Sequence, residues 1–128
     1  MVTMSEPNKA IVRAFYDLAF NDQRPAEAAA KFIGATYRQH NPGAADGPEP
    51  FVAFVTGFLK AFPKLRVTFK RMVAEGELVA LHSHFVREPG DGGLAVMDIF
   101  RLEGGKLVEH WDVLQEVPPA AANPNTMF

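Results

Sequence analysis

Residues 96–115 read VMDIFRLEGGKLVEHWDVLQ, and this stretch predicts two antiparallel strands joined at the glycine pair 104–105. A Gly-Gly pair accepts the positive φ that tight hairpin turns require. Alternate side chains of a strand share a face, so Asp98 falls beside Val96 and Phe100. A carboxylate on an apolar face is costly to bury unless it has a partner or a function. We therefore interpret this hairpin as one wall of a pocket.

The second strand of the hairpin carries another row of mixed character. Val108, His110, Asp112 and Leu114 share one face, which places ionisable groups close to Asp98. Trp111 points to the opposite face, where helix packing or a dimer contact is expected. Glu109 is most simply a solvated charge.

Composition narrows the class of protein. The chain has 128 residues, nearly half of them apolar with 11 phenylalanines, which predicts one folded domain over 1–128. Acidic and basic residues are interspersed along the chain and give a net charge of −2. The absence of a basic stretch argues against nucleic-acid binding. There is no cysteine for a disulfide or a thiolate metal site. No signal-peptide pattern and no run long enough to span a membrane is seen, so we expect a cytoplasmic protein.

The order of periodic segments predicts an α+β fold. Apolar spacing of three and four residues predicts helices over 5–19, 25–33 and 48–62, and alternation predicts strands over 36–42, 65–75 and 77–87 before the hairpin. We expect a curved antiparallel or mixed sheet with three N-terminal helices over its concave face, enclosing an apolar pocket. The core would span about residues 8–117, with 118–128 as a loose tail. Phe54 and Phe58 of the third helix are candidates for the pocket wall.

Three segments resemble a known family. Residues 37–42 (YRQHNP), 98–101 (DIFR) and 105–112 (GKLVEHWD) resemble the SnoaL-like polyketide cyclase group of the nuclear transport factor two-like superfamily. The resemblance covers about residues 8–117 and implies a cone-shaped α+β fold. It also implies a homodimer through the exposed sheet face, where Met97, Ile99 and Trp111 would give apolar contact. This fold hosts cyclases, isomerases, epoxide hydrolases, dehydratases and binding proteins, so it does not fix the function.

The resemblance also assigns a role to Asp98. Its position matches the carboxylate that acts as acid and base in SnoaL-like aldol cyclisation, and the protonated oxyanion acid of ketosteroid isomerases. Two departures disfavour the isomerase: its tyrosine would fall near Phe15, with Tyr16 adjacent but pointing elsewhere, and its base would fall at 39–41, where no carboxylate stands. The arginine and paired aspartates of the epoxide hydrolases are not recognisable.

The histidines are the expected partners of Asp98. His82 and His84 lie two apart on one strand and would face Asp98 if both rows point inward; otherwise one lies at the rim with a structural role. His110 could complete an Asp–His pair. His40 would lie at the mouth of the cone and bind a carbonyl, or serve turn chemistry before Pro42. The expected catalytic residues are Asp98, His82 and His110, and the expected substrate-binding residues are His84, His40, Tyr16, Asp112, Phe100, Phe54 and Phe58.

A metal-binding site is an alternative interpretation of the histidines. Gly76, His82, His84 and Glu88 follow a cupin-like spacing, to which His110 could add a third imidazole. The second cupin motif is missing, and three N-terminal helices do not suit an all-β barrel. We therefore expect no metal.

The sequence thus favours a cofactor-independent enzyme that acts on a small hydrophobic carbonyl compound. Asp98 would abstract a proton α to the carbonyl, and His82, His84 or His110 would stabilise the enolate or carry the proton. Aldol cyclisation is the expected reaction and isomerisation its nearest variant. The alternative is a binder of a small apolar ligand or of a partner protein.

Overall fold

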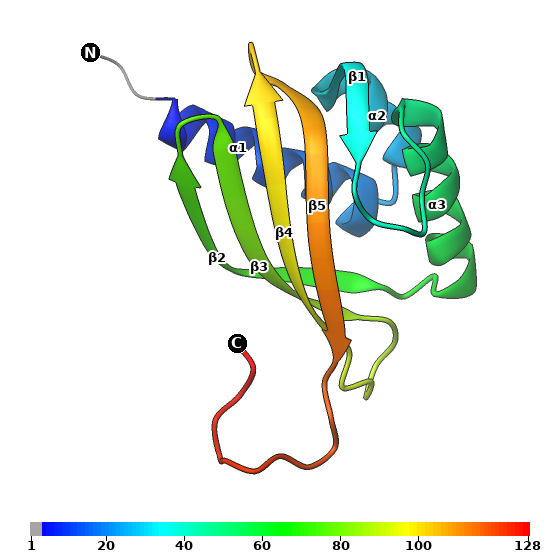
Figure 1. Ribbon diagram of the computed structural model, residues 1–128. Helices are drawn as coiled ribbons and strands as arrows, with labels where there is room; N and C mark the ends of the chain where they lie inside the picture. The colour runs from blue at the N-terminus through cyan, green and yellow to red at the C-terminus, as the bar shows by residue number, and fades with distance from the viewer. Residues whose placement is uncertain (1–3) are drawn as a thin grey trace.

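A mixed sheet with helices on one of its faces forms the fold (Figure 1). The computed structural model describes residues 4–128. In chain order they form α1 (Ser5–Tyr16), a short π-helix η1 (Asp17–Asn21), α2 (Pro25–Phe32), β1 (Ile33–Gln39), α3 (Pro48–Ala61), β2 (Arg66–Glu75), β3 (Leu78–Val86), β4 (Leu94–Glu103) and β5 (Lys106–Glu116).

The strand order is β1-β5-β4-β3-β2, and β1 pairs with β5 in parallel while the other pairs are antiparallel. The sheet does not close, and the helices cover its concave, inner face. The α+β fold class predicted from the sequence is therefore confirmed. None of the helices within residues 4–128 is long and apolar enough to cross a membrane.

The central hairpin is built as its sequence requires. Gly104 and Gly105 have φ of 55° and 77°, a region that glycine enters without steric cost. The strands leave this turn with alternating burial, and β4 buries Val96, Asp98, Phe100 and Leu102 on the inner face. Direct pairing of Asp98 with Asp112 and of Phe100 with His110 brings the two predicted polar rows together on that face.

Aromatic rings fill the space between the helices and the sheet. Phe15 of α1 is fully buried, with its ring centroid 4.9 Å from that of Phe51 and 6.0 Å from that of Phe100. The π-helix is tied to β2 by Asn21, whose amide donates to the Val67 carbonyl at 3.0 Å and accepts its N–H at 2.8 Å. These contacts fix α1 and η1 against the inner face, where the polar rows lie.

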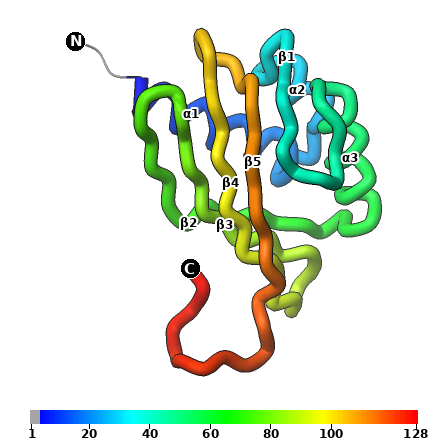
Figure 2. Tube along the Cα trace, viewed as in Figure 1, coloured from blue at the N-terminus to red at the C-terminus, as the bar shows by residue number. Residues whose placement is uncertain are grey.

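The tail after β5 loops past the lower ends of the strands and turns back toward β3 (Figure 2). Residues 117–128 form no helix or strand. The Phe128 ring nevertheless stacks on His84, with 4.2 Å between centroids. The sequence-based expectation of a loose tail missed this contact.

Candidate functional site

A small cavity lies between α3 and the inner face of the sheet. Its volume is about 80 Å³, well below the ~300–1,000 Å³ of pockets that hold drug-sized ligands. Its wall is mostly apolar and combines rings of α3 with aliphatic side chains of β4 and β5. The lining residues are Tyr16, Phe20, Gln39, Asn41, Ala44, Phe51, Phe54, Val55, Phe58, Phe85, Leu94, Val96, His110, Asp112 and Leu114.

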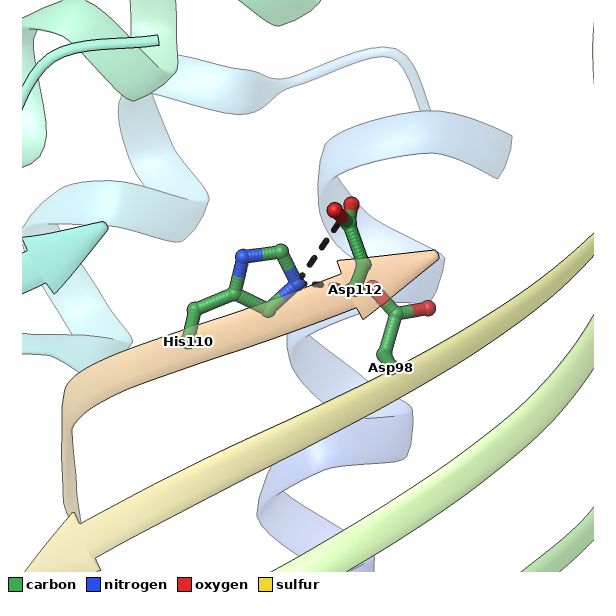
Figure 3. Close-up of side chains that lie close together, drawn as sticks. All are labelled: Asp98, His110 and Asp112. Carbon is green, nitrogen blue, oxygen red and sulfur yellow. Dashed lines mark hydrogen bonds and ion pairs between the residues drawn. The ribbon is translucent and has the colours of Figure 1, made fainter. Parts of the chain in front are cut away.

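Asp98 lies behind this wall rather than in it. Its side chain is 0% exposed, and its Oδ1 accepts a hydrogen bond of 2.7 Å from the Tyr16 hydroxyl. The same oxygen lies 2.7 Å from Nε2 of His110 (Figure 3). Oδ2 has no hydrogen-bond partner among residues 4–128. Asp98 therefore reaches the cavity only through Tyr16 and His110, which both line it.

The protons on His110 follow from its neighbours. The backbone N–H of Asn41 donates to Gln39 Oε1 at 3.0 Å, so the oxygen of that amide faces this way. Nδ1 of His110 lies 2.7 Å from the same oxygen and must therefore carry the proton that it donates. The second nitrogen, Nε2, then faces the Asp98 carboxyl, and a contact of this length fits a proton shared between them.

Asp112 is the carboxyl that meets the cavity. Its two oxygens lie 2.8 and 3.1 Å from the side-chain nitrogen of Asn41, and Oδ2 lies 3.8 Å from Nε2 of His110. Burial raises the pKa of Asp112, and the nearby charge of Asp98 adds to this rise. The His110 charge and the Asn41 hydrogen bond act in the opposite direction.

Tyr16 corrects one expectation drawn from the sequence. It does not point away from the site, because its hydroxyl donates to Asp98 while Phe15 packs in the core. Burial raises the pKa of Tyr16 well above 10, and the charge of Asp98 raises it further. The hydroxyl thus stays protonated and holds Asp98 in place.

The prediction that His82 and His84 face Asp98 is wrong. Asp98 pairs directly with Leu81, so His82 pairs with Met97 and falls on the outer face. His82 contacts Arg71 there, and Nε2 of His84 lies 2.7 Å from the Gly92 carbonyl oxygen. Burial, followed by the charge of Arg71, lowers the pKa of His82. The cupin-like metal set is wrong for the same reason, because His110 lies on the inner face.

Two further candidates lie away from the cavity. His40 is on the outer face, where its ring stacks on Trp111 at 4.8 Å and Nε2 lies 2.7 Å from Glu109 Oε2. Phe100 is fully buried beneath Tyr16 and His110, with ring centroids 5.3 and 4.7 Å away, and supports them without lining the cavity.

Sequence reasoning missed Gln39 as a functional candidate. It lies opposite His110 because β1 pairs in parallel with β5, and it fixes the His110 tautomer. Alternation along β1, in which Tyr37 is buried, puts residues 37 and 39 on one face. The sequence shows this alternation, but it does not show that β1 pairs with β5.

Asp98, His110 and Asp112 could also hold a metal ion, since one ligand atom from each lies within 4.8 Å of the others. The 2.7 Å contact between Asp98 and His110 is a hydrogen-bond distance, shorter than two ligands of one metal usually keep. A hydrogen-bonded pair explains the geometry without an ion.

The comparisons with known proteins agree with this architecture. Residues 12–110 match the SnoaL-like domain family, which covers most of the chain. The chain belongs to the SnoaL-like domain family. A comparison with curated proteins gives no match.

Solved structures resemble this SnoaL-like domain at low sequence identity. A protein described as a polyketide cyclase from Acidithiobacillus ferrooxidans has a TM-score of 0.73 at 19% identity, over 88% of this chain and 91% of its own. A protein described as a ketosteroid isomerase from Kribbella flavida has 0.70 at 20%, over 96% and 86%. AclR from Streptomyces galilaeus, described as a hydroxylase, has 0.66 at 23%, over 84% and 88%. These similarities support the fold.

Proposed function

We propose that this SnoaL-like domain is a cofactor-independent enzyme that moves a proton on a small hydrophobic carbonyl compound, with intramolecular aldol closure as the reaction. The observation that carries the proposal is the buried Asp98–His110 contact of 2.7 Å beside an apolar cavity. The family to which the chain belongs and the names of its structural relatives agree with an enzyme of this type.

His110 is the group that would meet the substrate. When no proton is shared between Nε2 and Asp98, the lone pair of Nε2 takes the proton α to the carbonyl, and the imidazolium that forms donates this proton to the Asp98 carboxylate across the 2.7 Å contact. The enolate carbon then attacks a second carbonyl of the same molecule. The new alkoxide takes the proton back from Nε2, which restores the starting form of the pair.

Asp98 and Tyr16 would act through His110. Asp98, fully buried and held by the Tyr16 hydroxyl, is a fixed negative charge where the imidazolium develops. Gln39 holds the ring by its Nδ1–H. The role expected for Asp98 from the sequence is thus revised from direct proton abstraction to stabilisation of the proton on His110.

The test is proton exchange on a probe. Acetophenone has α-protons and one ring, and its exchange with D2O is followed by NMR. Wild-type protein should accelerate this exchange, and Asp98→Asn and His110→Gln should each lower the acceleration by about 100-fold or more. Glu109→Gln, a neutralised carboxylate on the outer face of the same strand, should leave it unchanged.

A protein that binds acetophenone and never accelerates exchange would favour the alternative, a non-catalytic binder of small apolar ligands. Exchange that survives Asp98→Asn in a folded protein would remove the pair from the mechanism.

A further inference from the structure

Asp112 is the carboxylate of the cavity wall, and it has unused capacity to accept hydrogen bonds. An ionised carboxylate offers about four acceptor sites. Asp112 receives hydrogen bonds from one amide nitrogen, that of Asn41, at 2.8 and 3.1 Å. Nε2 of His110 lies 3.8 Å from Oδ2, beyond hydrogen-bond distance. The carboxylate therefore has room for a further donor.

Most of the polar groups around Asp112 already hold hydrogen bonds with one another. Asn41 cannot turn its amide, because its Oδ1 accepts the Gly43 N–H at 2.7 Å. The Tyr16 hydroxyl is bound to Asp98, and Gln39 Oε1 accepts from both His110 and Asn41. A ligand in the cavity thus meets an acceptor, Asp112, on a wall where the Tyr16 hydroxyl and the Asn41 amide nitrogen are in use and the Gln39 amide nitrogen is the remaining side-chain donor.

The charge of this wall is negative. Asp112 lines the cavity and Asp98 lies directly behind it, with His110 as the one ionisable base between the two carboxyls. Within residues 4–128, no lysine or arginine lines the cavity. A second anion would therefore enter an apolar space with no cation to offset it, which is unfavourable.

We propose that Asp112 selects the ligand: the cavity takes a neutral apolar compound that donates a hydroxyl hydrogen bond to Asp112, and it rejects carboxylates. A phenolic or enolic carbonyl compound fits this description, with its hydroxyl at Asp112 and its apolar part against the rings of α3. The inference rests on the proposed function in taking the same cavity as the substrate site.

The experiment compares four one-ring probes by NMR titration of the labelled protein. They are p-cresol, toluene, benzoate and benzylamine, which share a ring and differ in donor and charge. We expect p-cresol to bind about tenfold more tightly than toluene, since a hydrogen bond to a charged group has this strength. Benzoate should bind more weakly than toluene. Tighter binding of benzylamine than of p-cresol would assign Asp112 to cations and overturn the proposal.

Asp112→Asn isolates the cause. The substitution keeps the size of the side chain, removes its charge and turns an amide donor toward the cavity. The advantage of p-cresol over toluene should shrink, and benzoate should bind better than it does to the wild type. Glu109→Gln, which makes the same change of charge on the outer face, should keep the wild-type order. Wild-type preferences that persist in Asp112→Asn would overturn the proposal.

Binding needs no turnover, so the two proposals fail separately. Selection by Asp112 without proton exchange would remove the enzymatic function and keep the ligand class. Proton exchange with equal affinity for p-cresol and toluene would keep the enzymatic function and remove the ligand class.

Discussion

Two carboxyls on one face of the sheet lie in different surroundings, and a single imidazole separates them. Asp98 is fully buried and paired, whereas Asp112 lies at the cavity wall with only Asn41 as a direct partner. Burial disfavours the ionised form of Asp112 and raises its pKa. The folded protein therefore holds the proton of Asp112 more tightly than the unfolded chain does.

This difference predicts how stability depends on pH. A raised pKa in the folded state contributes stability below the unfolded value, 3.8, and this contribution is lost as pH rises through the folded pKa. Asp112→Asn, which cannot ionise, should therefore gain free energy of unfolding relative to wild type as pH rises from about 4 to about 7. Urea unfolding of both proteins across this range measures the difference.

Asp91 is a control whose pKa is shifted in the opposite direction, so its effect on the free energy of unfolding changes with pH in the opposite sense. Hydrogen bonds from Arg87 lower its pKa, so its contribution to stability grows as pH rises. Asp91→Asn should lose free energy of unfolding relative to wild type as pH rises toward about 4, which is below the range in which Asp112→Asn gains it. An Asp112→Asn difference that stays flat with pH would contradict the buried state of this carboxyl.

The residues of the site differ in how far the sequence could place them. Asp98, His110 and Asp112 lie on one hairpin, whose glycine turn fixes the register, so period-two spacing was enough to put them on one face. Tyr16 and Gln39 reach the site through packing of a helix and a parallel edge strand. Those contacts join residues far apart in the chain, which local spacing does not specify.

At the scale of elements, β3 shows why alternation alone was not sufficient. It divides Leu78–Val86 into two rows without saying which row is buried. The structure buries the row with Leu81 and Phe85, which also contains Ser83, and leaves the histidine row outside. The buried row has the larger apolar side chains, so comparing the two rows by apolar size would have placed His82 and His84 correctly.

The turn between β3 and β4 depends on Gly93. Its φ is 82°, and a Cβ there would lie 2.2 Å from the Phe85 carbonyl oxygen, so the backbone would have to move. Gly90, in the same turn, has φ 87° and open space around it. Gly90→Ala should cost about 1–2 kcal/mol from its left-handed backbone alone. Gly93→Ala should cost more than that, by about 2 kcal/mol or above, because the clash adds to the same strain. Thermal and urea unfolding of both variants measure the gap, and equal losses would contradict the packing of this turn.

At the scale of the whole molecule, the outer face of the sheet remains partly uncovered. Met97, Ile99 and Val113 are 41%, 39% and 72% exposed there, although the tail folds over the neighbouring His84. The overall fold was predictable because the order of helices and strands admits few arrangements. The partner that covers this apolar face could not be predicted, because the sequence of one chain does not specify what binds to it.

We propose that a second copy of the chain covers this face, in a homodimer joined through the outer surface of the sheet. Exposed apolar patches of this kind are typical of protein contacts. Sedimentation at micromolar concentration should then show twice the 14.1 kDa mass of one chain. Val113→Glu should give the monomer while preserving the fold, because Val113 is 72% exposed in the single chain and its replacement costs little core packing. Ala10→Glu, an added charge on the exposed side of α1, should remain dimeric. A monomeric wild type, or a Val113→Glu variant that sediments as wild type does, would rule out this interface.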